Sequence, residues 1–216
     1  MTATVAEKID GYFSKFPHRS YPKGQILVFA DESPEHIFYL VKGRVRKYDI
    51  SYRGEEVIVN LFKPPAFFPM SWAINRTTNK YYYKTEVETE LHVVPVDAAL
   101  DFLKANPDVM LDLLGRIYRG MDGLLGKMVH LMSGTAKSRI IYDLIIEGHR
   151  FGEKRDDGSI VLNINEVDLA SRSGLSRETV SRQMHNIKDH GWVSIGNKNI
   201  VIKDMGALEK SLGMEI

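Results

Sequence analysis

The sequence predicts an α+β protein with three parts: a domain of short strands, one long helix, and two short helices followed by a hairpin. Short apolar runs broken by turn residues fill residues 21–96. Apolar residues alternately four and three apart continue through residues 106–132. Capping residues and glycines between Asn165 and Gly191 mark two short helices joined by a tight turn. We place the three parts at residues 1–105, 106–134 and 135–216.

Composition limits the class of protein. The hydrophobic fraction of 44% is ordinary for a globular chain, and 216 residues suffice for two domains. No apolar run approaches the roughly 18 residues that cross a bilayer. The first ten residues lack the basic and apolar regions of a secretory signal. The chain has no cysteine, which excludes disulfides and cysteine-held iron–sulfur clusters. We expect a cytoplasmic protein with no membrane partner.

The N-terminal part reads as a β domain. Residues 5–16 predict a short amphipathic helix, and turn signals such as Lys42-Gly43 and Arg53-Gly54 separate the strands that follow. Many short strands at close spacing favour a sandwich or barrel. Asp97 is the expected cap of a brief helix after the last strand. The expected strands are Ile26–Phe29, Ile37–Leu40, Arg44–Ile50, Glu56–Leu61, Tyr82–Glu88 and Leu91–Val94.

The long helix carries an apolar stripe that predicts a coiled pairing with a second helix. Asn106 is its expected cap, and Pro107 suits the first helical position. A second apolar row, from Leu111 to Met132, is expected to pack against the chain's own body. Internal glycines weaken the helix, so either close packing or flexibility must explain them, and a core helix of a monomer is the alternative. The predicted dimer stripe is Met110, Leu114, Ile117, Met121, Leu124, Met128 and Leu131.

The C-terminal part begins after Ser133-Gly134-Thr135, where helical propensity is interrupted. An amphipathic helix should follow and end at Gly148, and residues 160–163 read as a strand. Asn165, with Asp168 three residues on, should cap the next helix, which should end at Gly174.

A second short helix should run from its cap Ser176 to His190, completing a helix-turn-helix. Its outer face is polar without being uniformly charged, as suits contact with base edges. The two strands that follow, around Gly196-Asn197, make a hairpin whose Lys198 can reach a sugar-phosphate backbone. Net charge is only +1, so any DNA binding must come from local placement of charge. The candidate DNA-binding residues are Ser176, Arg177, Glu178, Ser181, Arg182, His185 and Lys198.

Two stretches resemble the CRP/FNR (catabolite activator and fumarate–nitrate regulator) family of bacterial transcription factors. Residues 175–202 look like its winged helix-turn-helix and read LSRETVSRQMHNIKDHGWVSIGNKNIVI. Residues 37–68 look like its cyclic-nucleotide-binding-like β-roll and read IFYLVKGRVRKYDISYRGEEVIVNLFKPPAFF. The resemblance implies a homodimer that binds double-stranded DNA and meets RNA polymerase. It also implies a palindrome with a TGA-like half-site core, read by Arg177, Glu178, Ser181 and Arg182.

The chain departs from the family where cyclic nucleotides are held. Pro69 and Met70 occupy the positions of the family's Gly-Glu pair, and residues 79–84 contain no arginine. Proline lacks a backbone donor and methionine cannot accept a ribose hydroxyl, so we expect no cyclic AMP effector. An apolar pocket for another small molecule, side chains that simply fill the space, and DNA binding without ligand all stay open. The candidate pocket residues are Phe68, Met70, Trp72, Lys80, Tyr81 and Tyr82.

The sequence is compatible with three classes of function to different degrees. The leading hypothesis is a dimeric DNA-binding transcription regulator that has no cofactor. The alternative is a small-molecule-binding module that uses its helix-turn-helix for protein contacts. An enzyme is not expected, because the sequence lacks a nucleophile triad, a phosphate loop and metal-ligand spacing. His92 or a methionine could ligate haem in principle, but no motif supports it.

Overall fold

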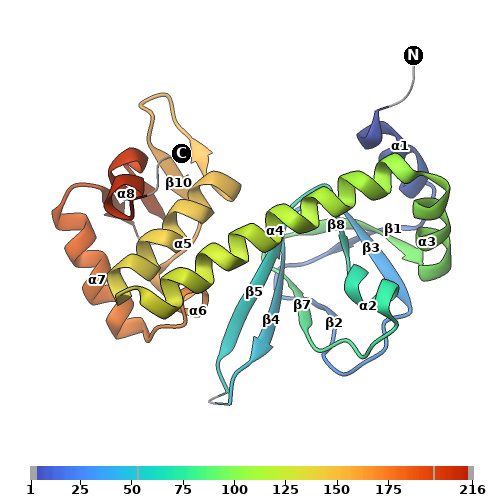
Figure 1. Ribbon diagram of the computed structural model, residues 1–216, viewed down its shortest axis with the longest axis horizontal. Helices are drawn as coiled ribbons and strands as arrows, with labels where there is room; N and C mark the ends of the chain where they lie inside the picture. The colour runs from blue at the N-terminus through green and yellow to red at the C-terminus, as the bar shows by residue number, and fades with distance from the viewer. Residues whose placement is uncertain (1–3, 53, 197, 214–216) are drawn as a thin grey trace. The chain divides into compact units, whose positions relative to one another are not determined.

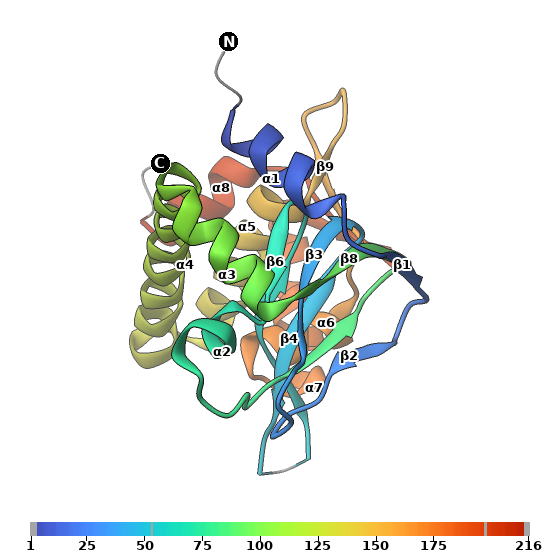
Figure 2. The same ribbon diagram turned by 90° about the vertical axis from the view of Figure 1, so that its right-hand side faces the viewer.

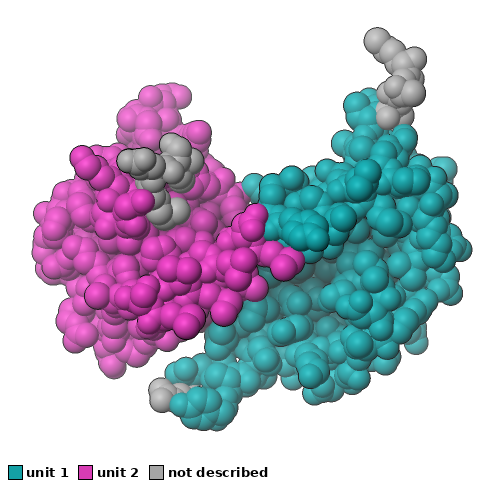
Figure 3. Space-filling view, viewed as in Figure 1, with its two compact units in different colours: residues 1–119 teal, residues 120–216 magenta. Residues whose placement is uncertain are grey.

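A computed structural model of the chain describes residues 4–52, 54–196 and 198–213 (Figure 1). Arg53 and Asn197, which fall in predicted turns, lie outside the described residues. The chain divides into two compact units, Met1–Arg119 and Gly120–Ile216 (Figure 3). The three-part division made from the sequence stays a prediction.

Unit 1 contains two antiparallel four-stranded sheets, in the orders β1-β8-β3-β6 and β2-β7-β4-β5. The predicted sandwich of short strands is therefore confirmed, and Figure 2 shows β3, β8 and β1 running side by side. Two strands and one helix, β1, β6 and α2, were not predicted. The elements are α1 (Val5–Phe13), β1 (His18–Tyr21), β2 (Ile26–Val28), β3 (His36–Lys42), β4 (Val45–Ile50), β5 (Glu56–Phe62), β6 (Ala66–Phe68), α2 (Met70–Asn75), β7 (Tyr82–Thr85), β8 (Thr89–Pro95) and α3 (Val96–Ala105).

The strand β3 shows why this unit has two cores. Alternate residues of a strand face opposite sides of the sheet, and four successive residues of β3 are buried. Ile37 and Tyr39 face α1 and α3, whereas Phe38 and Leu40 face the second sheet. A sheet covered on both faces needs such an unbroken apolar run.

The long helix α4 (Pro107–Ser133) begins and ends close to the predicted positions, with Pro107 as its first residue. Two predicted caps were wrong. Asn106 stands directly before α4 and its carbonyl accepts from Met110 N at 3.1 Å, but its side-chain amide donates back to the Phe102 carbonyl at 2.8 Å and so closes α3. Asp97 lies inside α3, which begins one residue earlier because Val96 is buried among the helices and the first sheet.

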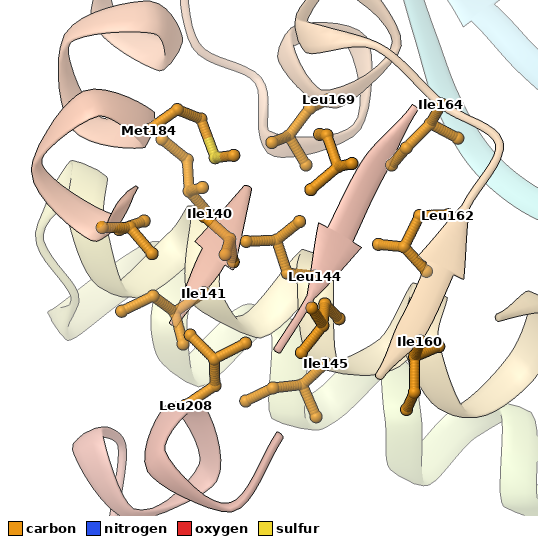
Figure 4. Close-up of a cluster of buried hydrophobic side chains, with 14 of the residues drawn as sticks. Ile140, Ile141, Leu144, Ile145, Ile160, Leu162, Ile164, Leu169, Met184 and Leu208 are labelled. Atoms are coloured by element: carbon orange, nitrogen blue, oxygen red, sulfur yellow. The ribbon is translucent and has the colours of Figure 1, made fainter. Parts of the chain in front are cut away.

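Unit 2 contains the four-stranded sheet β11-β12-β10-β9 and a set of helices around one apolar core (Figure 4). The prediction that the helix after residue 135 ends at Gly148 was wrong. A Cβ on Gly148 would lie 2.4 Å from Met205 Cε, so this glycine allows close packing instead. The elements are α5 (Ala136–Phe151), β9 (Glu153–Lys154), β10 (Ile160–Leu162), α6 (Glu166–Ser173), α7 (Arg177–Asp189), β11 (Val193–Ile195), β12 (Ile200–Ile202) and α8 (Met205–Ser211).

None of the helices in the described ranges is long and apolar enough to span a bilayer.

Candidate nucleic-acid interface

The helices α6 and α7 form the predicted helix-turn-helix, and local hydrogen bonds fix its ends. Asn165 Oδ1 caps α6 by accepting from Asp168 N at 3.1 Å, and Asp168 Oδ2 accepts from Asn165 N at 3.0 Å. Gly174 ends α6 with φ of +65°, a conformation that glycine adopts without strain. Ser176 caps α7 by accepting from Thr179 N at 3.2 Å. Every one of these ends follows the sequence signals.

The helix α7 buries one face and exposes another. Val180, Met184 and Ile187 are each 0% exposed and pack into the core of unit 2. These three anchors fix the rotation of the helix about its axis, so the opposite face has a defined orientation. That exposed face carries Ser176, Arg177, Glu178, Ser181, Arg182 and His185, as predicted.

The charged groups of this face are available for a ligand. Within the described residues, no carboxylate lies within ion-pair distance of Arg177 or Arg182. His185 lies 3.9 Å from Asp189, one helical turn on, and both side chains are largely exposed. An exposed pair of this kind contributes little to stability. The face therefore presents two arginines, one glutamate and one serine hydroxyl to an incoming partner.

The hairpin after α7 has the form of a wing. Strands β11 and β12 pair in antiparallel register, with Ser194 opposite Val201. Gly196 N donates to Asn199 O at 2.8 Å and closes the turn. Lys198 lies within this turn and is exposed. The wing is anchored through β12, which pairs with β10 inside the sheet.

The apolar stripe of α4 is exposed along its whole length. Its seven predicted dimer residues are each between 36% and 54% exposed. A monomeric protein rarely leaves so long a row of large apolar side chains in water. The second row was expected to pack against the chain's own body, and that prediction was wrong, since Leu111 and Met132 are 69% and 84% exposed. In unit 1 the helix instead turns Val109 and Leu113 toward the core.

The structure brings together only some of the candidate pocket residues of unit 1. Phe68 is fully buried between the sheets, where it stacks on Tyr83, and Met70 packs toward α1 and α3. Tyr82 stacks on Tyr48 on the outer face of the second sheet. Three of the six line one open hollow of about 620 Å³: Trp72, Lys80 and Tyr81. The pocket assignment itself stays a prediction.

Sequence reasoning missed Lys47 in this region. Lys47 lies on the inner face of β4, opposite Tyr83, and its ammonium is 3.9 Å from the centre of the Tyr81 ring. Burial lowers the pKa of this lysine. The alternation along β4 places apolar residues on its inner face. A lysine at one of these positions is the signal that could have identified Lys47. Lys47 and Tyr81 together fill space at the inner face of the sheet.

In the part of the chain that the structure describes, no group of three or more His, Asp or Glu side chains could hold a metal ion. His92 is buried, and its Nδ1 lies 2.8 Å from the Phe16 carbonyl. That bond makes His92 a structural link between β8 and the segment after α1.

Comparison with known proteins matches both units. Residues 18–106 match the cyclic nucleotide-binding domain, and residues 138–211 match the Crp-like helix-turn-helix domain. This chain belongs to the CRP/FNR family. The structure has the CRP/FNR fold, which consists of a β-sheet domain, a long helix and a C-terminal helix-turn-helix. CRP/FNR members of this type are DNA-binding transcription regulators, which favours DNA contact over the alternative of protein contacts alone.

Individual CRP/FNR relatives are distant but cover most of the chain. The global nitrogen regulator of Synechocystis is 25% identical over 88% of this chain and 86% of its own length. The cyclic AMP receptor protein of Thermus thermophilus is 23% identical over 94% of this chain and 92% of its own. The solved structure of a CRP/FNR-family transcriptional regulator, also from Thermus thermophilus, superposes with a TM-score of 0.75 at 18% identity. That superposition covers 91% of this chain and 98% of the other.

Proposed function

We propose that this CRP/FNR-type regulator is a homodimer that reads a palindromic DNA site with a TGA-like core in each half. The observation that carries the proposal is the exposed polar face of α7, held in a fixed rotation by three fully buried anchors. A rigid helix with short polar and bidentate side chains suits the major groove.

The candidate DNA-binding side chains fall into two groups, those that can contact base edges and those that can contact the sugar-phosphate backbone. Arg177 and Arg182 can each donate two hydrogen bonds to a guanine, and Glu178 can accept from a cytosine amino group. The Ser181 hydroxyl can bond to either kind of base edge. Lys198 of the wing reaches the sugar-phosphate backbone, where it adds affinity but no sequence information. Ser176 and His185 lie at the two ends of this exposed face of α7, which we call the reading face.

Dimerisation is proposed through the stripe of α4. Two copies packed along this stripe place two α7 helices on one side of the duplex, about 34 Å apart, as two successive major grooves require. A palindromic site follows from the two-fold symmetry of such a dimer. The bound dimer would then act on transcription through contact with RNA polymerase, which run-off transcription from a bound promoter would measure.

The test begins with selection of bound duplexes from a random pool. Arg182→Ala should then weaken binding to the selected site by roughly 1–3 kcal/mol per half-site and relax the preference at one base position. Arg155→Ala is the matched control, since Arg155 is also an exposed arginine of unit 2 but lies outside the helix-turn-helix and wing. Wild-type protein that binds selected and scrambled duplexes equally would refute the proposal.

We further propose that cyclic AMP is not the effector. Pro69 stands at the start of α2 without a side-chain cap, and Lys47 with Tyr81 fills part of the inner face of the sheet. The support comes from two positions. Pro69 has no backbone N–H to donate to a phosphate, and Met70 has no carboxylate to accept from a ribose hydroxyl. Cyclic AMP should leave the melting temperature and the DNA affinity unchanged. A saturable rise in either quantity would contradict this.

A further inference from the structure

The second half of α4 is joined to the rest of unit 2 through polar contacts. The Tyr142 hydroxyl of α5 donates to the Gly123 carbonyl at 2.9 Å, and Arg139 Nη2 of α5 donates to the Leu131 carbonyl at 2.6 Å. The large apolar side chains on this half of α4 stay exposed. Polar contacts hold only in a defined geometry, so the position of α4 on α5 depends on a small number of hydrogen bonds and on the contact between the His130 and Tyr142 rings.

Lys127 is the side chain that joins three helices. Its ammonium group lies 3.0 Å from Asp143 Oδ1 of α5 and donates to the Arg172 carbonyl of α6 at 2.6 Å. That carbonyl is in the last turn of α6, where backbone oxygens lack partners within the helix and favour a cation. Lys127 thus connects α4 directly to the first helix of the helix-turn-helix.

A buried ion pair continues the connection from α6 to α5. The Arg172 guanidinium pairs with Glu147, and the two side chains are 7% and 4% exposed. Asp143 is 9% exposed, and burial raises its pKa while Lys127 acts in the opposite direction. Removal of the Lys127 ammonium would leave this carboxylate without its nearest cation. The group therefore holds one arrangement of α4, α5 and α6.

We propose that Lys127 is a positioning residue for DNA recognition, which sets the angle at which the helix-turn-helix sits on the second half of α4. The proposal rests on the proposed dimer. In a dimer packed along α4, the distance between the two α7 helices depends on how each helix-turn-helix is fixed to its own α4. Lys127 touches no base and no phosphate, so it acts on the spacing of the two reading helices and not on what each one reads.

The test substitutes Lys127 by Met, which keeps the length of the side chain and removes the charge. The Lys127→Met protein should stay dimeric and should bind a single half-site duplex as wild type does. Its affinity for the full palindrome should fall about tenfold or more. Its preference for the natural half-site spacing over a spacing changed by one base pair should be lost. Lys127→Arg, which retains a donor for both acceptors, should restore the spacing preference.

Two further variants separate positioning from folding. The double variant Lys127→Met with Asp143→Asn removes the unpaired buried carboxylate, so it should fold and still lack the spacing preference. The control Lys104→Met breaks a solvent-exposed lysine–aspartate pair of 3.1 Å in α3 and should change nothing. Wild-type spacing preference and affinity in the double variant would overturn the proposal while leaving the proposed function intact. Wild-type protein without sequence preference would overturn both.

Discussion

At the scale of single residues, Gly174 decides the angle between α6 and α7. Its N–H and that of Leu175 both donate to the Ala170 carbonyl, at 3.0 and 3.3 Å, which turns the chain back at the end of α6. This turn requires positive φ, and a residue with a Cβ pays about 1 kcal/mol or more to adopt it. Apart from its two chain neighbours, no heavy atom of the described residues lies within 4 Å of the position that a Cβ on Gly174 would take. The requirement for glycine is therefore conformational and not steric.

Gly174→Ala should lower the free energy of unfolding by about 1–2 kcal/mol, because alanine is strained in the left-handed region. Urea denaturation followed by circular dichroism measures this change. Gly206→Ala is the matched control. Gly206 is a helical residue of α8 without positive φ, and a Cβ there would meet its nearest atom at an ordinary 3.6 Å. Gly206→Ala should leave the free energy of unfolding unchanged or raise it by up to about 1 kcal/mol. Equal destabilisation by both substitutions would contradict the conformational explanation.

Residues with local partners were predictable from the sequence, and residues with distant partners were not. Asn165 and Ser176 bond within three residues of themselves, so their spacing alone identifies them as caps. Arg172 reads as an ordinary basic residue of a helix end, yet it is buried against Glu147, which lies 25 positions earlier. Lys127 likewise meets Asp143 and the Arg172 carbonyl only after the helices have packed. No periodicity encodes such contacts.

At the scale of elements, different physical reasons explain why glycine occupies its several positions in α4. A Cβ on Gly126 would lie 2.7 Å from the Tyr142 hydroxyl, so this glycine admits α5 to the helix surface. Outside the helix's own backbone and the chain neighbours, the residues that the structure describes place no heavy atom within 4 Å of a Cβ built on Gly120 or Gly123. Close packing therefore explains Gly126, and the structure gives no steric reason for Gly120.

Gly120→Ala and Gly126→Ala should consequently change stability in opposite directions. Alanine at residue 120 should stabilise the helix by up to about 1 kcal/mol, because it reduces the conformational freedom of the unfolded chain. Alanine at residue 126 should displace the Tyr142 hydroxyl and break its bond to Gly123, at a cost of about 1 kcal/mol. Urea denaturation of the two variants in parallel measures the difference. Stabilisation by both substitutions would contradict this, since it would mean that the Tyr142 hydroxyl can move away from residue 126 without a cost in stability.

Sequence patterns found the longer elements and missed the shortest ones. Helix α4 bears an apolar periodicity along its length, and strands such as β3 and β5 are seven-residue segments rich in apolar side chains. Strand β1 is only His18–Tyr21, mostly exposed and polar, and it exists because it pairs with β8 about seventy residues later. Strand β6 likewise depends on pairing with β3. The exposed polar face of α7 was predictable because caps and buried anchors lie within the same short segment.

At the scale of the whole molecule, the exposed stripe of α4 is the feature that the single chain leaves unexplained. Its residues alternate four and three apart, the spacing that brings one line of a helix against a partner. The side chains through which α4 packs inside each unit lie on other sides of the helix, namely Val109 and Leu113 in unit 1 and Lys127 in unit 2. The stripe is therefore free to meet a second copy.

Leu124→Asp should convert the protein from a dimer to a monomer, because it places a charge in the middle of the apolar stripe, where no partner cation is expected. Sedimentation equilibrium at micromolar concentration measures the mass. Binding of the variant to the palindrome should fall to the level of a single half-site. Val129→Asp is the control, since Val129 is 60% exposed on the same helix but lies outside the stripe. Wild-type protein that sediments as a monomer, even with the palindrome present, would rule out the dimer.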